Sequence, residues 1–211
     1  MAGNKKPQKP QKNKTFEKES WKGSVITAPL PPALVSCGTA EKPNVLTVAW
    51  TGVLCTKPPV TYISVRPERF SYDIIKKSRE FVINLPTDSL VRAVDLCGVK
   101  SGRDTDKFAL TGLTAVPAFN VAAPMIAECP VSVECRVREI VPLGSHDMFI
   151  ADIVGVGAAK ELLDDKGRLA LEKAGLLAYA HGAYFSLGKQ LGTFGYSVRK
   201  KKTPVRRREQ K

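Results

Sequence analysis

The stretch from Thr61 to Leu85, TYISVRPERFSYDIIKKSREFVINL, constrains the fold more than any other part of the chain. It begins with β-branched and aromatic residues, which predict a strand at 60–65. Pro67 ends that strand because its ring fixes φ and removes a backbone N–H donor. Apolar residues then recur at helical spacing from residue 70, and FVINL at 81–85 predicts a second strand. The segment therefore predicts a strand, a helix and a strand in close succession.

Four polar side chains gather where the first of these strands passes into the helix: Ser64, Arg66, Arg69 and Ser71. Guanidinium groups match phosphate oxygens, and hydroxyl groups add further donors. The first turn of a helix also presents free N–H groups, and its dipole favours anions. The pattern is therefore consistent with a phosphate site. The alternative is that the two arginines pair with Glu68 or Asp73 and that Ser71 only caps the helix.

The rest of the chain is predicted to be mainly β, with added helices. Further strands are expected at 45–50, 131–141 and 148–159. Within 131–138, apolar residues alternate with polar ones, which predicts one buried face and one wet face that carries Ser132, Glu134, Arg136 and Arg138. A helix is expected at 87–98, with Thr87 or Asp88 as its cap and Gly98 just past its end. DDKG at 164–167 predicts a turn, and short strands at this spacing favour a β-barrel or sandwich.

Composition limits the class of protein. A chain of 211 residues with 43% hydrophobic residues is long enough for one domain with a good core, and no apolar run reaches the length of a membrane span. The first 14 residues contain no apolar stretch of the kind found in secretory signals. Five cysteines without a C-x-x-C pair, beside only two histidines, argue against a zinc site or a disulfide framework. These features favour a cytoplasmic protein.

The net charge of +13 is concentrated at the two ends of the chain. Residues 1–22 hold seven lysines and two glutamates, and residues 198–211 hold eight lysines and arginines and one glutamate. We therefore expect basic flexible tails at 1–22 and 198–211 around a folded domain at 23–197. The tail at 198–211 has no aromatic residue that could stack on bases, and the tail at 1–22 has only Phe16 and Trp21, so nucleic-acid binding is not favoured. An acidic partner or an anionic lipid is the other use that a basic tail could have.

A series of short motifs resembles the flavin reductase-like proteins, and more closely the flavoredoxin branch of the FMN-binding split-barrel superfamily. The series runs in order over about residues 25–197. It consists of TVAWTG (47–52), TKPPV (56–60), the Ser64-x-Arg66 to Arg69-x-Ser71 helix start, FVINLP (81–86), SGRDTDKF (101–108), GSHDMFIADIVGV (144–156) and YFSLGKQLGTFG (184–195). The resemblance implies a six-stranded Greek-key split β-barrel that binds FMN rather than FAD without a covalent bond. It also implies a homodimer with flavin sites near the subunit interface.

The resemblance also assigns residues to the flavin. Thr47, Val48, Ala49, Trp50 and Thr51 would lie along the isoalloxazine ring, with Trp50 either stacking on it or belonging to the core. Ser64, Arg66 and Ser71 would hold the phosphate, with Val65 also at the cofactor, whereas Arg69 would be free to face solvent. Asn84 would form hydrogen bonds either with the isoalloxazine ring or with the protein backbone. Ser101, Arg103 and Lys107 would close over the phosphate or ribityl chain, unless Lys107 pairs with Asp104 or Asp106.

His146 is the one candidate catalytic residue. Related reductases carry Gly-Asp-His where this chain has Gly144-Ser145-His146, near the nicotinamide side of the flavin. A histidine there could place a hydride donor or move a proton, and the alternative is a turn histidine bonded to backbone. The resemblance implies either an NAD(P)H:flavin oxidoreductase or an electron-transfer flavoprotein with a redox partner protein. A noncatalytic flavin-binding barrel, or a protein that works through its basic tails, is the alternative.

Overall fold

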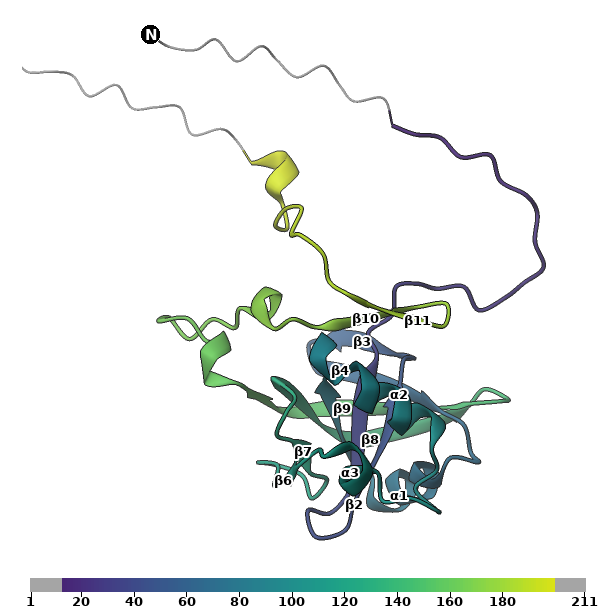
Figure 1. The fold of residues 1–211 in the computed structure, drawn as a ribbon, viewed down its shortest axis with the longest axis vertical. Helices are drawn as coiled ribbons and strands as arrows, with labels where there is room; N and C mark the ends of the chain where they lie inside the picture. Colours follow the sequence, from purple (N-terminus) through teal and green to yellow (C-terminus); the bar gives the residue numbers. More distant parts are fainter. Residues whose placement is uncertain (1–12, 200–211) are drawn as a thin grey trace, which may run out of the picture.

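The computed structural model describes residues 13–199, and its main element is one antiparallel sheet of seven strands (Figure 1). In spatial order the strands are β2 (Pro43–Val48), β1 (Ala33–Gly38), β5 (Glu80–Leu85), β8 (Val131–Pro142), β9 (Asp147–Ala158), β4 (Pro59–Val65) and β3 (Thr51–Thr56). Two small sheets pair β6 (Ala115–Val116) with β7 (Met125–Ile126) and β10 (Leu177–Ala180) with β11 (Ala183–Ser186). The helices are α1 (Phe70–Ser78), α2 (Val91–Val99) and α3 (Lys107–Thr111), with 3₁₀ turns η1 (Asp88–Leu90), η2 (Lys160–Leu162), η3 (Leu171–Lys173) and η4 (Tyr196–Val198).

The connection between β2 and β3 brings the two edges of the main sheet together. These strands lie at opposite ends of the strand order, yet only Ala49 and Trp50 join them. The backbone N–H of Ser64 on β4 also donates to the carbonyl of Trp50, at 2.9 Å. The sheet must therefore curl on itself, and the result is a barrel that stays open along part of its seam.

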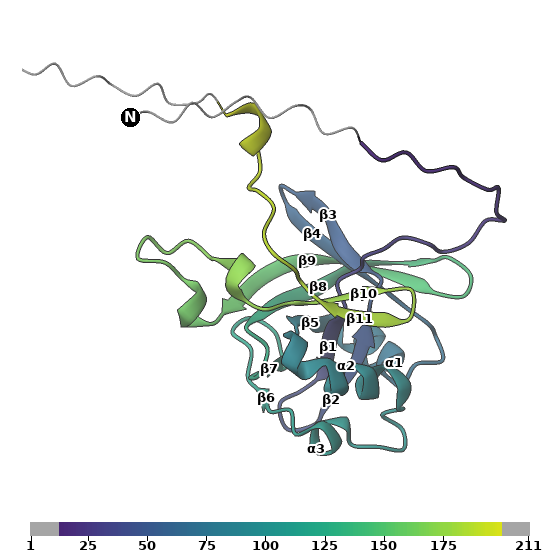
Figure 2. The same ribbon diagram turned by 45° about the horizontal axis from the view of Figure 1, so that its top comes forward.

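The curled sheet has a core on each of its faces. The inner core is filled by strand residues such as Ile63, Phe81 and Phe149, with Ile75 of α1 closing one end. On the outer face, α2 and α3 pack on β1 and β2 through a second cluster that includes Leu34 and Val94 (Figure 2). Strand β1 is therefore buried on both sides, which explains why its side chains are apolar apart from that of the buried Ser36.

Several predicted elements are confirmed. The strand, helix and strand of 61–85 are β4, α1 and β5, although β4 and β5 are not neighbours in the sheet. The 164–167 turn is present, with the N–H of Gly167 donating to the carbonyl of Asp164 at 2.8 Å. The expected helix at 87–98 is instead η1 followed by α2, and Gly98 lies inside the helix. The main sheet has seven strands where six were expected.

The prediction of a wet face on β8 is wrong at two positions. Ser132 is 4% exposed and Glu134 is fully buried, because the segment 117–126 covers this part of the strand. The backbone N–H of Asn120 donates to Oε2 of Glu134 at 2.6 Å, and Arg136 Nη2 donates to the carbonyl of Asn120. The covering segment lies close in the sequence to β8 and returns over it, which strand periodicity alone does not reveal.

Within residues 13–199 no helix is long and apolar enough to cross a membrane. The same residues contain no group of three or more His, Cys, Asp or Glu side chains that could hold a metal ion. The five cysteines are free thiols, and Cys55 alone among them is exposed. Residues 13–28 have no regular secondary structure, whereas the basic residues predicted to be flexible at 1–12 and 200–211 lie outside the described part.

Candidate functional site

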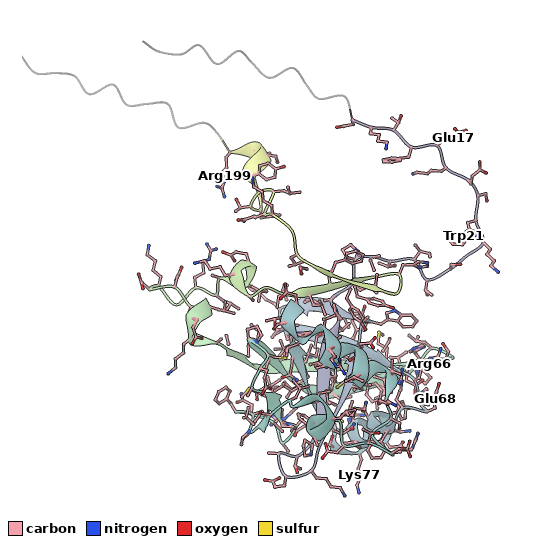
Figure 3. The ribbon with its side chains drawn as sticks, in the orientation of Figure 1. Glu17, Trp21, Arg66, Glu68, Lys77 and Arg199 are labelled. Carbon is pink, nitrogen blue, oxygen red and sulfur yellow. The ribbon has the colours of Figure 1, made fainter. Side chains whose placement is uncertain are left out.

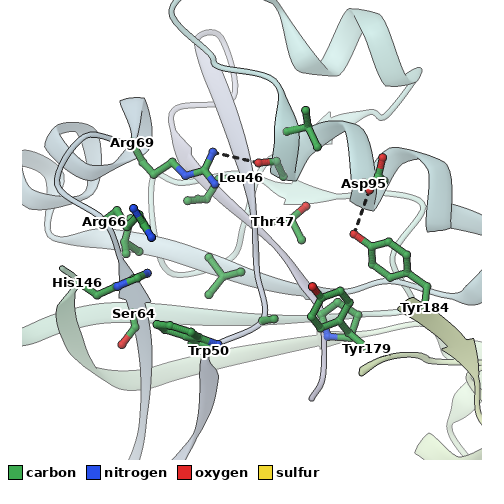
Figure 4. A pocket seen from close by; sticks show the side chains of 16 residues that line it. Leu46, Thr47, Trp50, Ser64, Arg66, Arg69, Asp95, His146, Tyr179 and Tyr184 are labelled. Atoms are coloured by element: carbon green, nitrogen blue, oxygen red, sulfur yellow. Dashed lines mark hydrogen bonds between the residues drawn. The ribbon is translucent and has the colours of Figure 1, made fainter. Parts of the chain in front are cut away.

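Two adjoining cavities lie where β2 leaves the sheet and β4 meets α1. The first, which we call the aromatic cavity, measures about 370 Å³ and contains the side chains of Trp50, Tyr179 and Tyr184 (Figure 4). The second, the cationic cavity, measures about 400 Å³. They share Leu46, Arg66 and Arg69. Each volume falls in the range of about 300–1,000 Å³ that small-molecule sites occupy, so together they form one elongated candidate site.

The connection from β2 to β3 forms one wall of the aromatic cavity. It carries the indole ring of Trp50, which lies against the imidazole of His146 with ring centroids 4.4 Å apart (Figure 4). The side chain of Thr47 also lines the cavity, but its hydroxyl donates to the carbonyl of Val94 on α2, at 2.5 Å. This wall is therefore mainly apolar surface and backbone, with one exposed aromatic face.

The opposite wall is made by the small sheet of β10 and β11 and by α2. The rings of Tyr179 and Tyr184 lie with centroids 5.3 Å apart. The hydroxyl of Tyr184 donates to Oδ1 of Asp95 at 3.4 Å (Figure 4). Burial, together with the nearby Asp95 carboxylate, raises the pKa of Tyr184, so its hydroxyl stays protonated at neutral pH. The cavity thus has aromatic rings on both sides.

Five cations line the cationic cavity: Arg66, Arg69, Lys100, Arg103 and Lys107. Arg66 forms an exposed ion pair with Glu68, in which Nη1 lies 3.2 Å from Oε1. Figure 3 shows both side chains at the surface. Arg69 Nη1 donates to the carbonyl of Gly98 at 3.0 Å, and Arg103 Nη1 donates to that of Glu68 at 2.9 Å. Each of these contacts uses one of the five N–H donors of a guanidinium group. The arginines are therefore held in place with donors to spare.

Lys107 is the buried cation of this cavity. Its side chain is 6% exposed, and Nζ donates to the carbonyls of Val45 at 2.8 Å and Cys97 at 2.9 Å. It pairs with neither Asp104 nor Asp106, and the carboxylate of Asp106 instead caps α3. Burial lowers the pKa of Lys107. Among the described residues, the ammonium group of Lys107 has two carbonyl acceptors but no carboxylate partner. Because this buried positive charge is not neutralised, the cavity favours an anion.

His146 stands at the mouth of the aromatic cavity. Its Nδ1 lies 3.0 Å from the hydroxyl of the neighbouring Ser145. Burial lowers the pKa of His146, and the positive charges of Arg66 and Arg69 act in the same direction against the opposing effect of Glu68. The imidazole is therefore held in its neutral form at neutral pH, in which one ring nitrogen accepts and the other donates.

Most of the predicted site residues are brought together here. Those that line one or both cavities are Thr47, Val48, Ala49, Trp50, Ser64, Val65, Arg66, Ser71, Ser101, Arg103, Lys107 and His146. Ser71 is 2% exposed, and its hydroxyl accepts a hydrogen bond from Nδ2 of Asn44 at 2.7 Å. The helix α1 begins at Phe70, close to where the sequence predicted it. Ser71 does not cap this N-terminus, since α1 has no side-chain cap.

The structure does not place Thr51 and Asn84 in either cavity. The hydroxyl of Thr51 donates across the β3–β4 pair to the carbonyl of Tyr62, at 2.6 Å. Asn84 is fully buried in the barrel wall. Its Nδ2 donates to Leu34 and Ser36, and its Oδ1 accepts from Ile126 and Ser132. The side-chain amide of Asn84 therefore forms its hydrogen bonds with neighbouring strands and segments of the barrel wall.

Several residues of the site were not predicted from the sequence. The local pattern grouped Arg69 with the candidate phosphate residues, whereas the resemblance left it facing solvent; it lines both cavities. Asp95, Tyr179 and Lys100 carry no local motif that distinguishes them from surface residues. Tyr184 is the first residue of the predicted YFSLGKQLGTFG segment, which is the signal that could have identified it.

Comparison with known proteins gives consistent results. A family model described as "Flavin reductase like domain" matches residues 25–188. The structure resembles flavoredoxin of Desulfovibrio vulgaris (Miyazaki F), with a TM-score of 0.80 and 30% identity over 87% of this chain and 100% of that one. It also resembles flavoredoxin from Methanosarcina acetivorans (TM-score 0.78, 25% identity, 87% and 100% covered) and an FMN-binding protein from Thermus thermophilus (0.71, 25%, 85% and 99%).

Proposed function

The chain belongs to the flavin reductase-like family, in its flavoredoxin branch, and on that premise we propose that it binds FMN and transfers electrons or hydride. The observation that carries the proposal is the joining of an aromatic cavity to a cationic one through Leu46, Arg66 and Arg69. FMN has the same division, since a planar ring system is linked by a sugar chain to a phosphate.

The residues present fit this cofactor. Phosphate oxygens would accept from the guanidinium groups of Arg66, Arg69 and Arg103, and the buried ammonium of Lys107 would add charge nearby. The isoalloxazine would lie along residues 47–50, with the ring of Trp50 at its edge or face. The FMN-binding protein from Thermus thermophilus among the structural neighbours supports FMN as the flavin.

When bound, the flavin supplies the redox chemistry, and the chain supplies binding and orientation. The arginines anchor the anionic end, so the ring enters the aromatic cavity in one direction. The rings of Tyr179 and Tyr184 limit the width of that cavity. The neutral imidazole of His146, fixed by Trp50 and Ser145, is placed to hold or move a proton at the mouth.

NAD(P)H is the proposed electron donor, and reduction of the bound flavin tests it. Purified protein loaded with FMN is mixed without oxygen with NADH or NADPH, and the visible flavin band is followed. Bleaching at a rate that saturates with the nicotinamide supports a reductase. Flavin that is bleached by dithionite but by neither nicotinamide would contradict a reductase and leave an electron carrier that needs a redox partner protein.

We also propose that the protein is a homodimer. Residues 187–198 extend away from the barrel (Figures 1 and 2) and expose five large apolar side chains, the first of them Leu187. Leu191 is 92% exposed and Phe194 entirely so, and Tyr196 and Val198 are also exposed. The segment at 13–26 likewise exposes Trp21 (Figure 3). We propose that a second copy of the chain covers these apolar side chains, because two such segments can be exchanged symmetrically between copies.

The dimer is tested by measuring the mass in solution by light scattering. The full chain should have twice the mass of one copy, and the double variant Leu191→Asp/Phe194→Asp should shift to the mass of a monomer. Leu110→Asp, at an exposed leucine on α3, is the matched control. A monomeric full chain, or a dimer that the double variant leaves intact, would contradict this arrangement.

A further inference from the structure

The side chain of Tyr72 joins α1 to the strand end beside His146. Its hydroxyl donates to Oδ2 of Asp147 at 2.5 Å, and Asp147 is the residue that follows His146 and begins β9. Tyr72 lies in the first turn of α1, where its backbone N–H donates to the carbonyl of Arg69 at 2.9 Å. One side chain therefore connects the helix start, which carries an arginine of both cavities, with the residue next to the imidazole at the mouth.

The hydrogen bond between Tyr72 and Asp147 lies in a packed setting. Tyr72 is 6% exposed, and its ring meets that of Phe149 edge to face, with centroids 5.3 Å apart. The ammonium group of Lys76 lies 5.5 Å from the centroid of the same ring. The hydrogen bond to Asp147 is the main cause that raises the pKa of Tyr72 to about 12. The hydroxyl therefore stays protonated at neutral pH and remains the donor.

His146 lies just beyond the end of two strand ladders. Asp147 pairs with Val65 of β4 and with Pro142 of β8, and each of these is the last pair of its ladder. The turn beyond them is closed by a backbone hydrogen bond from the N–H of Leu143 to the carbonyl of His146, at 3.0 Å. Ladder ends open more easily than ladder interiors, so a side-chain anchor at Asp147 limits the motion of its neighbour.

The side chains of Asp147 and His146 point to opposite sides of the strand end, as successive residues of an extended chain do. The carboxylate of Asp147 turns toward Tyr72, whereas the imidazole of His146 meets Trp50 at the mouth of the aromatic cavity (Figure 4). We propose that Tyr72, through its hydrogen bond to Asp147, is a positioning residue that fixes the imidazole of His146 at that mouth. The inference rests on the proposed function, because it takes His146 as the group that holds or moves a proton beside the flavin.

A hydrogen bond and a charge at Asp147 can be separated by substitution. The charged groups that shift the pKa of His146 lie between β4 and α1: Arg66, Glu68 and Arg69. The carboxylate of Asp147 therefore acts on the imidazole through the backbone and not through its charge. Asp147→Asn removes the charge but keeps an oxygen that accepts from the hydroxyl of Tyr72, whereas Asp147→Ala removes both.

The test follows the titration of His146 by NMR in flavin-free protein. The chain has two histidines, so the spectrum of His146→Gln identifies the signal. Tyr72→Phe and Asp147→Ala should both raise the pKa of His146 toward its ordinary value of about 6.5, because a released imidazole becomes exposed to water. Asp147→Asn should keep the wild-type titration.

Asp152→Ala is the matched control, because it removes an aspartate from the same strand at a side chain that pairs with Arg138 instead. It should leave the titration of His146 unchanged. A titration that is the same in wild type, Tyr72→Phe and Asp147→Ala would overturn the inference. So would an Asp147→Asn variant that titrates like Asp147→Ala, since the charge and not the hydrogen bond would then be the cause.

A second measurement connects the position of His146 to the flavin. In FMN-loaded protein, the reduction potential plotted against pH should bend at the pKa of His146, and the bend should move with that pKa in Tyr72→Phe. A bend that stays in place while the titration of His146 moves would overturn the inference and leave FMN binding intact. A protein that binds no flavin would overturn the proposed function, on which the titration of flavin-free protein does not depend.

Discussion

The indole of Trp50 and the imidazole of His146 lie against each other, with ring centroids 4.4 Å apart and planes inclined by 41°. Trp50 comes from the short connection that closes the barrel, and His146 comes from the turn between β8 and β9. The contact therefore joins two segments that lie far apart in the sequence at the mouth of the aromatic cavity. Burial is the main cause of the lowered pKa of His146.

The lowered pKa predicts how stability depends on pH. The unfolded chain binds a proton at His146 near pH 6.5, whereas the folded chain binds it only at lower pH. Below about pH 6.5 the unfolded state therefore holds more protons, and the free energy of unfolding should fall as the pH falls. Denaturant unfolding of wild type and His146→Gln across this range measures the effect. Equal slopes for the two proteins would contradict the burial of His146.

Arg66→Ala should weaken FMN binding at least about tenfold, because a charge-assisted hydrogen bond to phosphate contributes about 1.5–3 kcal/mol. Riboflavin, which has no phosphate, should lose much less affinity in the same variant. Arg138→Ala, which removes an arginine paired with Asp152 on another part of the barrel, is the control. Equal losses for FMN and riboflavin would place the phosphate elsewhere.

Asn84→Ala should destabilise the fold and leave flavin affinity unchanged. The substitution strips five hydrogen-bond partners, among them the hydroxyl of Ser132 and the backbone N–H of Ile126, in the interior of the barrel wall. Each buried group left unpaired costs about 1–3 kcal/mol, so a loss of at least about 2 kcal/mol is expected in denaturant unfolding. Reduced FMN affinity in a variant of near wild-type stability would instead put Asn84 at the flavin.

Gly102→Ala should weaken binding of FMN without unfolding the protein. The new methyl group must push the loop away from Asn44 and Phe70, and with it the guanidinium group of Arg103. Isothermal titration should show the loss, while the melting temperature should change little because the loop lies at the surface. Gly112→Ala, with open space around it but a φ of +70°, controls for backbone strain alone. Unaltered FMN affinity in Gly102→Ala would show that the loop does not position the phosphate contacts.

Local signals in the sequence predicted the elements that depend on neighbours along the chain. Pro67 and the apolar spacing of Phe70 and Ile74 were enough to place the end of β4 and the start of α1. The resemblance grouped Arg66, Ser71 and Lys107, and all three line the cationic cavity. These residues are brought together by one continuous segment and the loop that packs on it, so sequence order and spatial order agree.

Other features depend on contacts that no local pattern records. Glu134 reads as a solvent-facing residue, and it is buried because the segment 117–126 returns over β8. Lys107 finds its acceptors on Val45 and Cys97, not on the aspartates beside it. Tyr179 reaches the aromatic cavity only through the pairing of β10 with β11. The prediction for Glu134 is wrong because a tertiary contact overrides a local preference, and the surroundings of Lys107 and Tyr179 also depend on tertiary contacts.

The absorption spectrum of the purified protein, with the mass of the cofactor it releases, tests the central claim most directly. We expect a yellow protein with a flavin spectrum, or a colourless one that turns yellow on addition of FMN or FAD, and release of the same flavin on denaturation. A colourless protein that takes up neither flavin would contradict the assignment of the aromatic and cationic cavities to a flavin.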